Sequence, residues 1–158
     1  MEQRGILQSQ GKNFMKGGKV FLDTNILIYA HDTSAGKKHE LARNVVLELW
    51  ESGEGVLSTQ VLQEFFVSVT KKIPKPLDVK LVKEIVNNLL KWDVVINNGE
   101  SILEAIEIHM QHKYSFWDSM IIEAAIRGNT TLLLSEDLSD GQIINGVKIK
   151  NPFLEHQT

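Results

Sequence analysis

The chain has 158 residues, the size of one ordinary domain. Its apolar fraction of 42% and charged fraction of 23% are those of a globular protein. The sequence has no cysteine, which excludes disulfides, a thiolate nucleophile, iron–sulfur clusters and cysteine-bound zinc. The formal net charge of −3 excludes a polycationic nucleic-acid coat, so a nucleic-acid partner would need local basic patches or cations that offset acidic residues.

The first 18 residues differ in composition from the rest of the chain. Residues 1–18 are rich in Gln, Gly, Ser and Lys without a sustained period, and Met15 is an alternative start. We expect them to form an extension, disordered or introduced by cloning, ahead of a folded domain at 19–154. Residues 1–10 lack the apolar core of a signal peptide, and apolar runs such as 26–30 are too short to cross a bilayer. We therefore expect a cytoplasmic protein with no membrane partner.

The first half of the domain alternates short apolar runs with helical periodicity. Residues 20–22 form a continuous apolar run, typical of a strand buried on both faces, and 23–25 are polar residues that can cap a helix. Strands are further expected at 56–57 and 94–96. The spacing of apolar residues predicts helices over about 25–31, 38–51, 58–70 and 77–91.

The second half repeats this alternation. Asn97 is expected to cap a helix in capping-box register with Glu100, and Ser115 is expected to cap the next helix. We expect a strand at 131–134, a polar loop at 136–146 and a last, edge strand at 147–149. The residues expected to face inward on the two helices are Ile102, Ala105, Ile106, Met110, Trp117, Ile121, Ala124 and Ala125.

Helices clearly outweigh strands, and most strands are short, apolar on both faces and separated by helices. This pattern predicts a three-layer α/β/α fold around a central, mainly parallel sheet of four to five short strands. In such sheets the ligand site lies beyond the carboxyl ends of the strands.

Four acidic residues are candidates for that edge. Asp23 and Asp137 follow the strands at 20–22 and 131–134, Asp118 lies in the first turn of a helix, and Glu64 lies two turns into another. Each has a structural explanation when taken alone. Asp23 and Asp118 can serve as caps, Asp137 as a turn residue and Glu64 as a surface glutamate at the border of an apolar stripe.

Taken together, the four acids indicate a cation site. Four carboxylates at one partly buried edge would repel one another unless divalent cations bound between them. Carboxylate oxygens suit Mg²⁺ and Mn²⁺, and Mg²⁺ held by few carboxylates and several waters typically meets a phosphate. The reaction that this pattern favours is phosphodiester hydrolysis.

Four segments resemble the motifs of the PIN domain family, in the order in which that family has them. They are FLDTNILIYA at 21–30, STQVLQEF at 58–65, YSFWDS at 114–119 and LLSED at 133–137. The resemblance spans about 19–153. It implies a PIN-like fold and a Mg²⁺- or Mn²⁺-dependent ribonuclease, often the toxin of a bacterial toxin–antitoxin pair and often a homodimer.

The resemblance also assigns roles to single residues. It makes Asp23, Glu64 and Asp118 the metal-binding core and Asp137 the fourth acid, although Glu136 and Asp140 lie close to it in sequence. It implies that Asn25 supports the first acid and that Ser119 orients water or metal. These two supporting residues complete the candidate catalytic set.

The sequence leaves several alternatives open. Lys71, Lys72 and Lys75 either guide an RNA backbone or form an ordinary solvated helix end. Trp117 is expected in the core rather than as a platform for base stacking. The leading hypothesis is a toxin endoribonuclease with an RNA substrate and an antitoxin partner. The alternatives are a housekeeping RNA-processing PIN nuclease and a catalytically silent RNA-binding or scaffold domain, and the presence of all four acids argues against a silent one.

Overall fold

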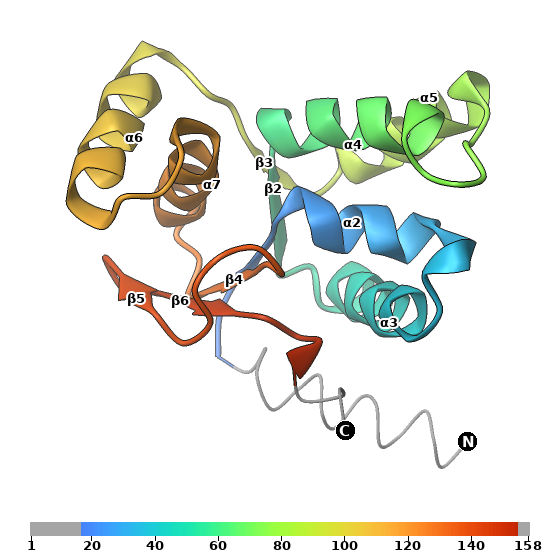
Figure 1. Cartoon of the computed structure of the whole chain (residues 1–158), viewed down its shortest axis with the longest axis horizontal. Coiled ribbons are helices and arrows are strands. Elements are labelled where there is room, and N and C mark those ends of the chain that lie inside the picture. Colours follow the sequence, from blue (N-terminus) through green and yellow to red (C-terminus); the bar gives the residue numbers. More distant parts are fainter. Residues whose placement is uncertain (1–16, 155–158) are drawn as a thin grey trace.

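The computed structural model describes residues 17–154, which form one sheet covered by helices on both faces (Figure 1). The sheet has the order β3-β2-β1-β4-β6-β5, with every neighbouring pair parallel except β5 and β6. Most of the expected extension at 1–18, including Met15, lies outside the described residues. The strands are β1 (Val20–Leu22), β2 (Gly55–Ser58), β3 (Asp93–Val95), β4 (Leu132–Leu134), β5 (Ile143–Ile144) and β6 (Val147–Lys150).

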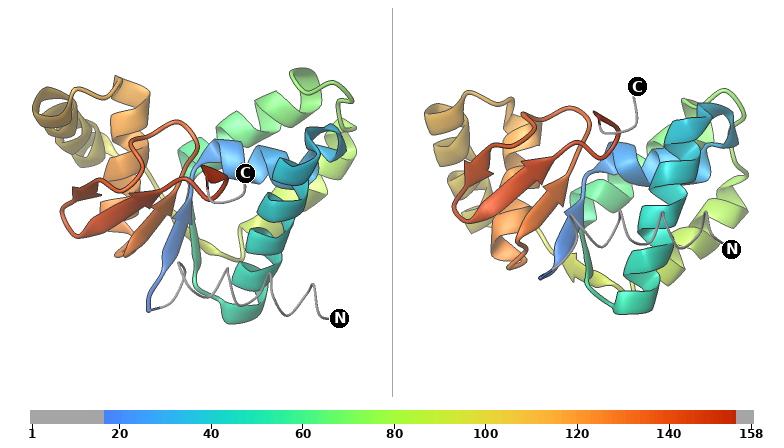
Figure 2. Two further views of the ribbon diagram at one scale, coloured as in Figure 1. Left: turned by 60° about the horizontal axis from the view of Figure 1, so that its bottom comes forward. Right: turned by 90° about the horizontal axis from the view of Figure 1, so that it is seen from below.

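The helices form two groups. Helices α6 and α7 cover one face of the sheet, and α2 to α5 cover the other, an arrangement that both views of Figure 2 repeat. This confirms the three-layer α/β/α prediction. No helix between residues 17 and 154 is long and apolar enough to cross a membrane. The helices are α2 (Thr24–His31), α3 (Lys37–Ser52), α4 (Thr59–Lys71), α5 (Val79–Leu89), α6 (Gly99–His112) and α7 (Phe116–Arg127), with a short 3-10 helix η1 (Thr33–Ala35).

The central strands are buried on both faces, as their continuous apolar runs predict. Phe21 of β1 pairs with Val56 of β2 on one side and with Leu133 of β4 on the other, and all three side chains are fully buried. Because these strands run parallel, their carboxyl ends lie at one edge of the sheet. The residues that follow β1, β2 and β4 are therefore brought together there.

The sheet has six strands, rather than the four to five expected, because a hairpin replaces part of the expected polar loop. Ile143 and Ile144 pair antiparallel with β6 through a turn formed by Asn145 and Gly146. Both turn residues have positive φ, 46° and 84°, and an Asn-Gly pair adopts this geometry readily. The Asn-Gly pair between two apolar runs was the signal for this hairpin in the sequence.

Helix α6 begins one residue later than expected. Asn98, not Asn97, is its N-cap, and its side chain accepts a hydrogen bond from the Ser101 backbone N–H at 3.0 Å. The Ser101 hydroxyl accepts from the Asn98 N–H at 2.7 Å, so Ser101 takes the capping-box position expected for Glu100. The buried face consequently shifts around the helix. It carries Ser101, Ala105 and Ile108, while Ile102, Ile106 and Met110 are exposed.

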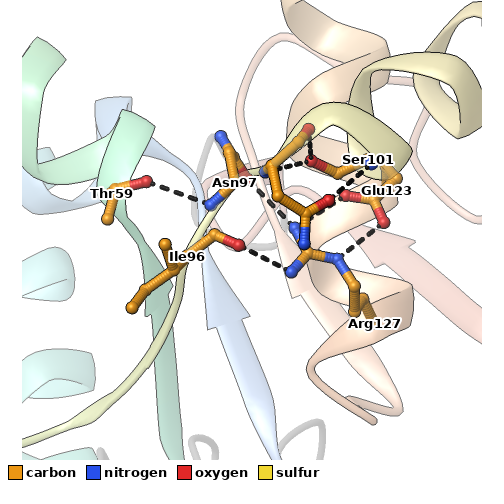
Figure 3. Close-up of polar contacts among 7 residues, drawn as sticks. Thr59, Ile96, Asn97, Ser101, Glu123 and Arg127 are labelled. Carbon is orange, nitrogen blue, oxygen red and sulfur yellow. Dashed lines mark hydrogen bonds and ion pairs between the residues drawn. The ribbon is translucent and has the colours of Figure 1, made fainter.

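Asn97 instead belongs to a network of hydrogen bonds around Arg127 at the end of α7 (Figure 3). Arg127 forms an ion pair with Glu123, with Nε to Oε2 at 2.9 Å, and donates to the Ile96 carbonyl at 2.7 Å and to Asn97 Oδ1 at 3.2 Å. The Asn97 N–H donates to Thr59 Oγ1 at 3.4 Å. The network ties the connection between β3 and α6 to both α7 and the first turn of α4.

Candidate active site

Asp23 follows β1 directly and caps α2. Its Oδ1 accepts from the Thr24 N–H at 2.7 Å, and its Oδ2 accepts from the Ser135 hydroxyl at 2.7 Å, so strand ends β1 and β4 meet at this carboxylate. The residue is only 6% exposed. Burial raises the pKa of Asp23 to about 7, although these two hydrogen bonds act to lower it. The negative charges of Asp118 and Glu64 add to the rise. Asp23 is therefore both a helix cap and a carboxyl that resists ionisation.

Glu64 of α4 lies beside the start of α2. Its Oε1 accepts from the hydroxyl of Thr24 at 2.8 Å, and Thr24 is the residue that follows Asp23 in the chain. Glu64 is exposed, as a surface glutamate would be, yet it points into the region where the other acids lie. This bond gives Glu64 a fixed position relative to the end of β1.

Asp118 stands in the first turn of α7. Its backbone N–H donates to the Ser115 hydroxyl at 3.1 Å, which confirms Ser115 as the N-cap. Burial raises the pKa of the Asp118 carboxyl, and the negative charge of Asp137 adds to the rise. The repulsion expected among the acids is thus present, but burial is the larger cause.

Asn25 contacts the fourth acid rather than the first. Its Nδ2 donates to Asp137 Oδ2 at 2.9 Å, and its Oδ1 accepts from the Glu136 N–H at 3.3 Å. The resemblance implied support of Asp23, but the side-chain bonds of Asp23 go to Thr24 and Ser135. Asn25 therefore holds the loop after β4 against α2.

The structure distinguishes Asp137 from the two acids near it in sequence. Glu136 accepts from the Tyr29 hydroxyl at 2.7 Å and pairs with the Lys38 Nζ at 2.5 Å. Asp140 accepts from the Asn151 N–H at 2.7 Å. Both are occupied in holding the fold, and of the three acids only Asp137 faces the cleft.

All four predicted acids line one open cleft at the carboxyl edge of the sheet, with a volume of about 550 Å³. Lys72 lines it as well, whereas Lys71 and Lys75 are exposed outside it. Ser119 is fully buried and absent from the lining, and its hydroxyl has no hydrogen-bond partner within residues 17–154. The lining consists of Asp23, Thr24, Asn25, Ile28, Gln60, Gln63, Glu64, Val67, Ser68, Lys72, Trp117, Asp118, Ile121 and Asp137.

Trp117 lies at the cleft and not in the core, which overturns the sequence-based expectation. It is 63% exposed, because the first turn of α7 faces the cleft although later residues of the same stripe, such as Ile121, are buried. Gln60 is a further lining residue that the motifs did not single out, and its Nε2 donates to the Trp117 carbonyl at 3.2 Å across the cleft wall. Its position two residues after the buried strand β2 was the available signal.

The donor set of the cleft fits a hard divalent cation. Between residues 17 and 154 no three acidic or histidine side chains stand as a ready-made metal cage. Mg²⁺ does not require one, because it keeps several waters and takes only one or two carboxylates directly. Four carboxylates around one cleft, two of them with raised pKa values, supply such oxygens and gain from a cation that offsets their charge.

The fold and this acidic cleft define a class of α/β/α proteins with carboxylates gathered at the strand ends. The sequence profile of the PIN domain matches residues 20–139, most of the chain, and the chain belongs to the PIN domain family. No curated protein matches the sequence significantly.

Solved structures confirm a fold like that of VapC proteins. The toxin–antitoxin complex from Klebsiella pneumoniae has a TM-score of 0.62 and 19% identity, covering 85% of this chain and 98% of that one. The DNA-bound VapBC from Salmonella typhimurium has a TM-score of 0.58 and 17% identity, covering 86% and 99%. The VapC20 of Mycobacterium tuberculosis, described as a sarcin-ricin loop cleaving toxin, has a TM-score of 0.58 and 17% identity, covering 73% and 87%.

Proposed function

We propose that this protein is a cytoplasmic endoribonuclease that depends on Mg²⁺ or Mn²⁺ and hydrolyses RNA phosphodiester bonds. The observation that carries the proposal is the convergence of Asp23, Glu64, Asp118 and Asp137 on one cleft. Membership of the PIN domain family and the likeness to a solved toxin described as sarcin-ricin loop cleaving support it.

In this proposal the four carboxylates hold the cation. When bound, Mg²⁺ or Mn²⁺ would activate a water molecule and stabilise the charge that develops on the phosphate and the leaving oxygen. The protein supplies the positions of the ligands. Ser135 and Thr24 orient Asp23, Asn25 orients Asp137, and Lys72 offers a positive charge to an approaching RNA backbone.

We further propose that the enzyme is the toxin of a toxin–antitoxin pair rather than a housekeeping nuclease. Two of its structural neighbours are described as a toxin–antitoxin complex and as VapBC. The chain also has an apolar groove of about 610 Å³ between α4 and α5, and Gln63 and Val67 line both this groove and the acidic cleft. An antitoxin segment with an apolar face would fit there and reach the cleft. The apolar side chains lining the groove are Leu62, Phe66, Val67, Val79 and Val86.

The gene next to this one distinguishes the two roles. A short upstream reading frame whose product co-purifies with this chain and blocks its RNA cleavage would support the toxin. A protein that cleaves RNA but has no such neighbour would be the housekeeping nuclease.

The homodimer implied by the family resemblance is part of the proposal too, and the exposed apolar side chains Ile102, Leu103, Ile106 and Met110 of α6 support it. Sedimentation velocity tests that association directly.

RNA cleavage by the purified protein tests the enzymatic proposal. We expect cleavage with Mg²⁺ or Mn²⁺ that stops on addition of EDTA. Asp118→Asn should lower the rate by about 100-fold or more, because it removes a charged oxygen from the cation site. Asp140→Asn is the matched control, since Asp140 is an acid outside the cleft that accepts from the Asn151 N–H, and it should cleave like the wild type.

The outcomes separate the candidate functions. A folded Asp118→Asn protein that cleaves at the wild-type rate would show that the site is wrongly placed. RNA binding without cleavage under any metal condition would favour the catalytically silent RNA-binding domain.

A further inference from the structure

Trp117 is an aromatic side chain left open beside the acids. It precedes Asp118 in the first turn of α7, lines the cleft and is 63% exposed. An exposed apolar side chain needs no explanation by itself, but this ring lies beside carboxylates and a lysine in the same cleft, where a ligand held by those groups would also meet it. Its place among the charged groups of the cleft therefore points to contact with a ligand bound there.

The backbone that carries Trp117 is held in place before any ligand arrives, and one aromatic contact limits the ring. It packs edge-to-face against Phe116, with centroids 5.1 Å apart and an interplanar angle of 74°. Its backbone carbonyl accepts from Gln60 Nε2 at 3.2 Å, which connects the start of α7 to the first turn of α4. Ser115 caps the helix on the other side. These contacts reduce the ordering cost of a ligand that stacks on Trp117.

The rest of the lining indicates what that ligand is. The cleft offers carboxylates for a cation, and Lys72 is the one lysine or arginine among its described lining residues. Phosphate groups would be drawn to the cation and Lys72. The neutral π face of Trp117 matches instead a flat, uncharged group joined to those phosphates. A nucleobase is such a group, and base–aromatic stacking tolerates any base because every base has a π face.

We propose that Trp117 is a substrate-positioning residue that stacks on an unpaired nucleobase next to the scissile phosphate. This inference rests on the proposed ribonuclease function and names the feature of RNA that the site requires. A base inside a duplex is already stacked on both faces, so the site selects RNA in which that nucleotide is unpaired.

The test measures cleavage of a single-stranded RNA oligonucleotide and of copies in which one base at a time is removed to leave an abasic sugar. Trp117→Leu removes the π face but keeps an apolar side chain, and Trp117→Phe restores a smaller one. Trp50→Leu is the matched control, because Trp50 is an exposed tryptophan on α3 outside the cleft that packs on Trp92. Thermal unfolding of each variant checks that it is folded.

We expect Trp117→Leu to lower kcat/KM about 5- to 150-fold, mainly through KM, the range given by loss of one stacked base. Trp117→Phe should recover part of the loss, and Trp50→Leu should match the wild type. At one position near the cleavage site, removing the base should slow the wild type by a similar factor and leave Trp117→Leu unaffected, since the two changes remove the same contact.

Three results would overturn the inference. Wild-type kcat/KM in Trp117→Leu would show that the ring does not contact the substrate. Abasic positions that slow the variant as much as the wild type would show that the ring acts through the fold. A wild-type dimer that becomes monomeric in Trp117→Leu, measured by sedimentation, would assign the ring to a contact with a second copy. If the wild type cleaves no RNA at all, the proposed function fails together with this inference, whereas the other three results leave that function standing.

Discussion

At the residue scale, Asp23 combines a structural role with a chemical one. As the N-cap of α2 it needs a side-chain oxygen, and an asparagine would serve there equally well. Its charge is the costly part, since the carboxyl is buried and faces two other acids. A carboxylate retained where an amide would cap the helix at lower cost is what a cation site requires.

This predicts how the stability of the metal-free protein depends on pH. The pKa of Asp23 rises from an ordinary 3.8 to about 7 in the fold. The Asp23 carboxyl therefore makes its full contribution to the free energy of folding below about pH 4. That contribution is lost as the pH rises through about 7, the pKa of Asp23 in the folded protein. Asp23→Asn removes the titration, so in EDTA at pH 8 it should unfold with a free energy larger by roughly 2–4 kcal/mol than the wild type.

Urea denaturation of both proteins in EDTA at pH 4 and pH 8 measures this difference. The advantage of Asp23→Asn should be large at pH 8 and nearly absent at pH 4. A variant that is less stable than the wild type at both pH values would contradict the assignment, because the cap would then outweigh the charge.

At the element scale, the network around Arg127 keeps α7 and α4 in fixed positions relative to each other. It connects the last turn of α7 through Asn97 to Thr59 at the start of α4 (Figure 3). Gln60 separately connects the start of α4 to the start of α7. These helices carry Asp118 and Glu64. Contacts remote from the acids thus maintain the shape of the cleft.

Removing Arg127 should destabilise the protein measurably. Arg127→Met keeps the aliphatic stem but leaves Glu123, which is buried, without its cation. We expect a loss of about 1–3 kcal/mol in the free energy of unfolding. The double variant Arg127→Met with Glu123→Leu should recover part of that loss, because it removes the unpaired charge. Urea denaturation at neutral pH gives both values, and a double variant no more stable than the single one would show that the ion pair is not the source.

The elements also show where local sequence signals suffice. Ser115 was predicted as a cap because a short hydroxyl residue directly precedes an apolar helical stripe, and Ser58, where the third helix was expected to open, is the N-cap of α4 for the same reason. Asn97 and Asn98 are both good caps, and in the structure Asn97 bonds to Arg127 and Thr59 while Asn98 forms the capping box with Ser101. Apolar periodicity does not distinguish the two asparagines, so the expected inward face of α6 was wrong at Ile102, Ile106 and Met110.

At the scale of the whole molecule, topology explains why the candidate acids could be chosen from sequence. The rule that parallel strands end at one edge brings Asp23 and Asp137 together, and α4 and α7 begin at the same edge. The same rule says nothing about how the helices pack beside one another at that edge. The exposure of Trp117, the contact of Gln60 and the groove between α4 and α5 follow from that packing and required the structure.

The central claim is that the four carboxylates of the cleft act together as one cation site. Titration of Mn²⁺ into the metal-free protein by calorimetry at pH 7.5 tests it most directly, with Asp118→Asn and Asp140→Asn as the matched pair. We predict saturable binding by the wild type and by Asp140→Asn, and affinity at least about tenfold weaker in Asp118→Asn, because loss of a ligand should cost no less than loss of a group that merely orients one. Equal affinity in all three proteins, or no saturable binding by the wild type, would contradict the claim.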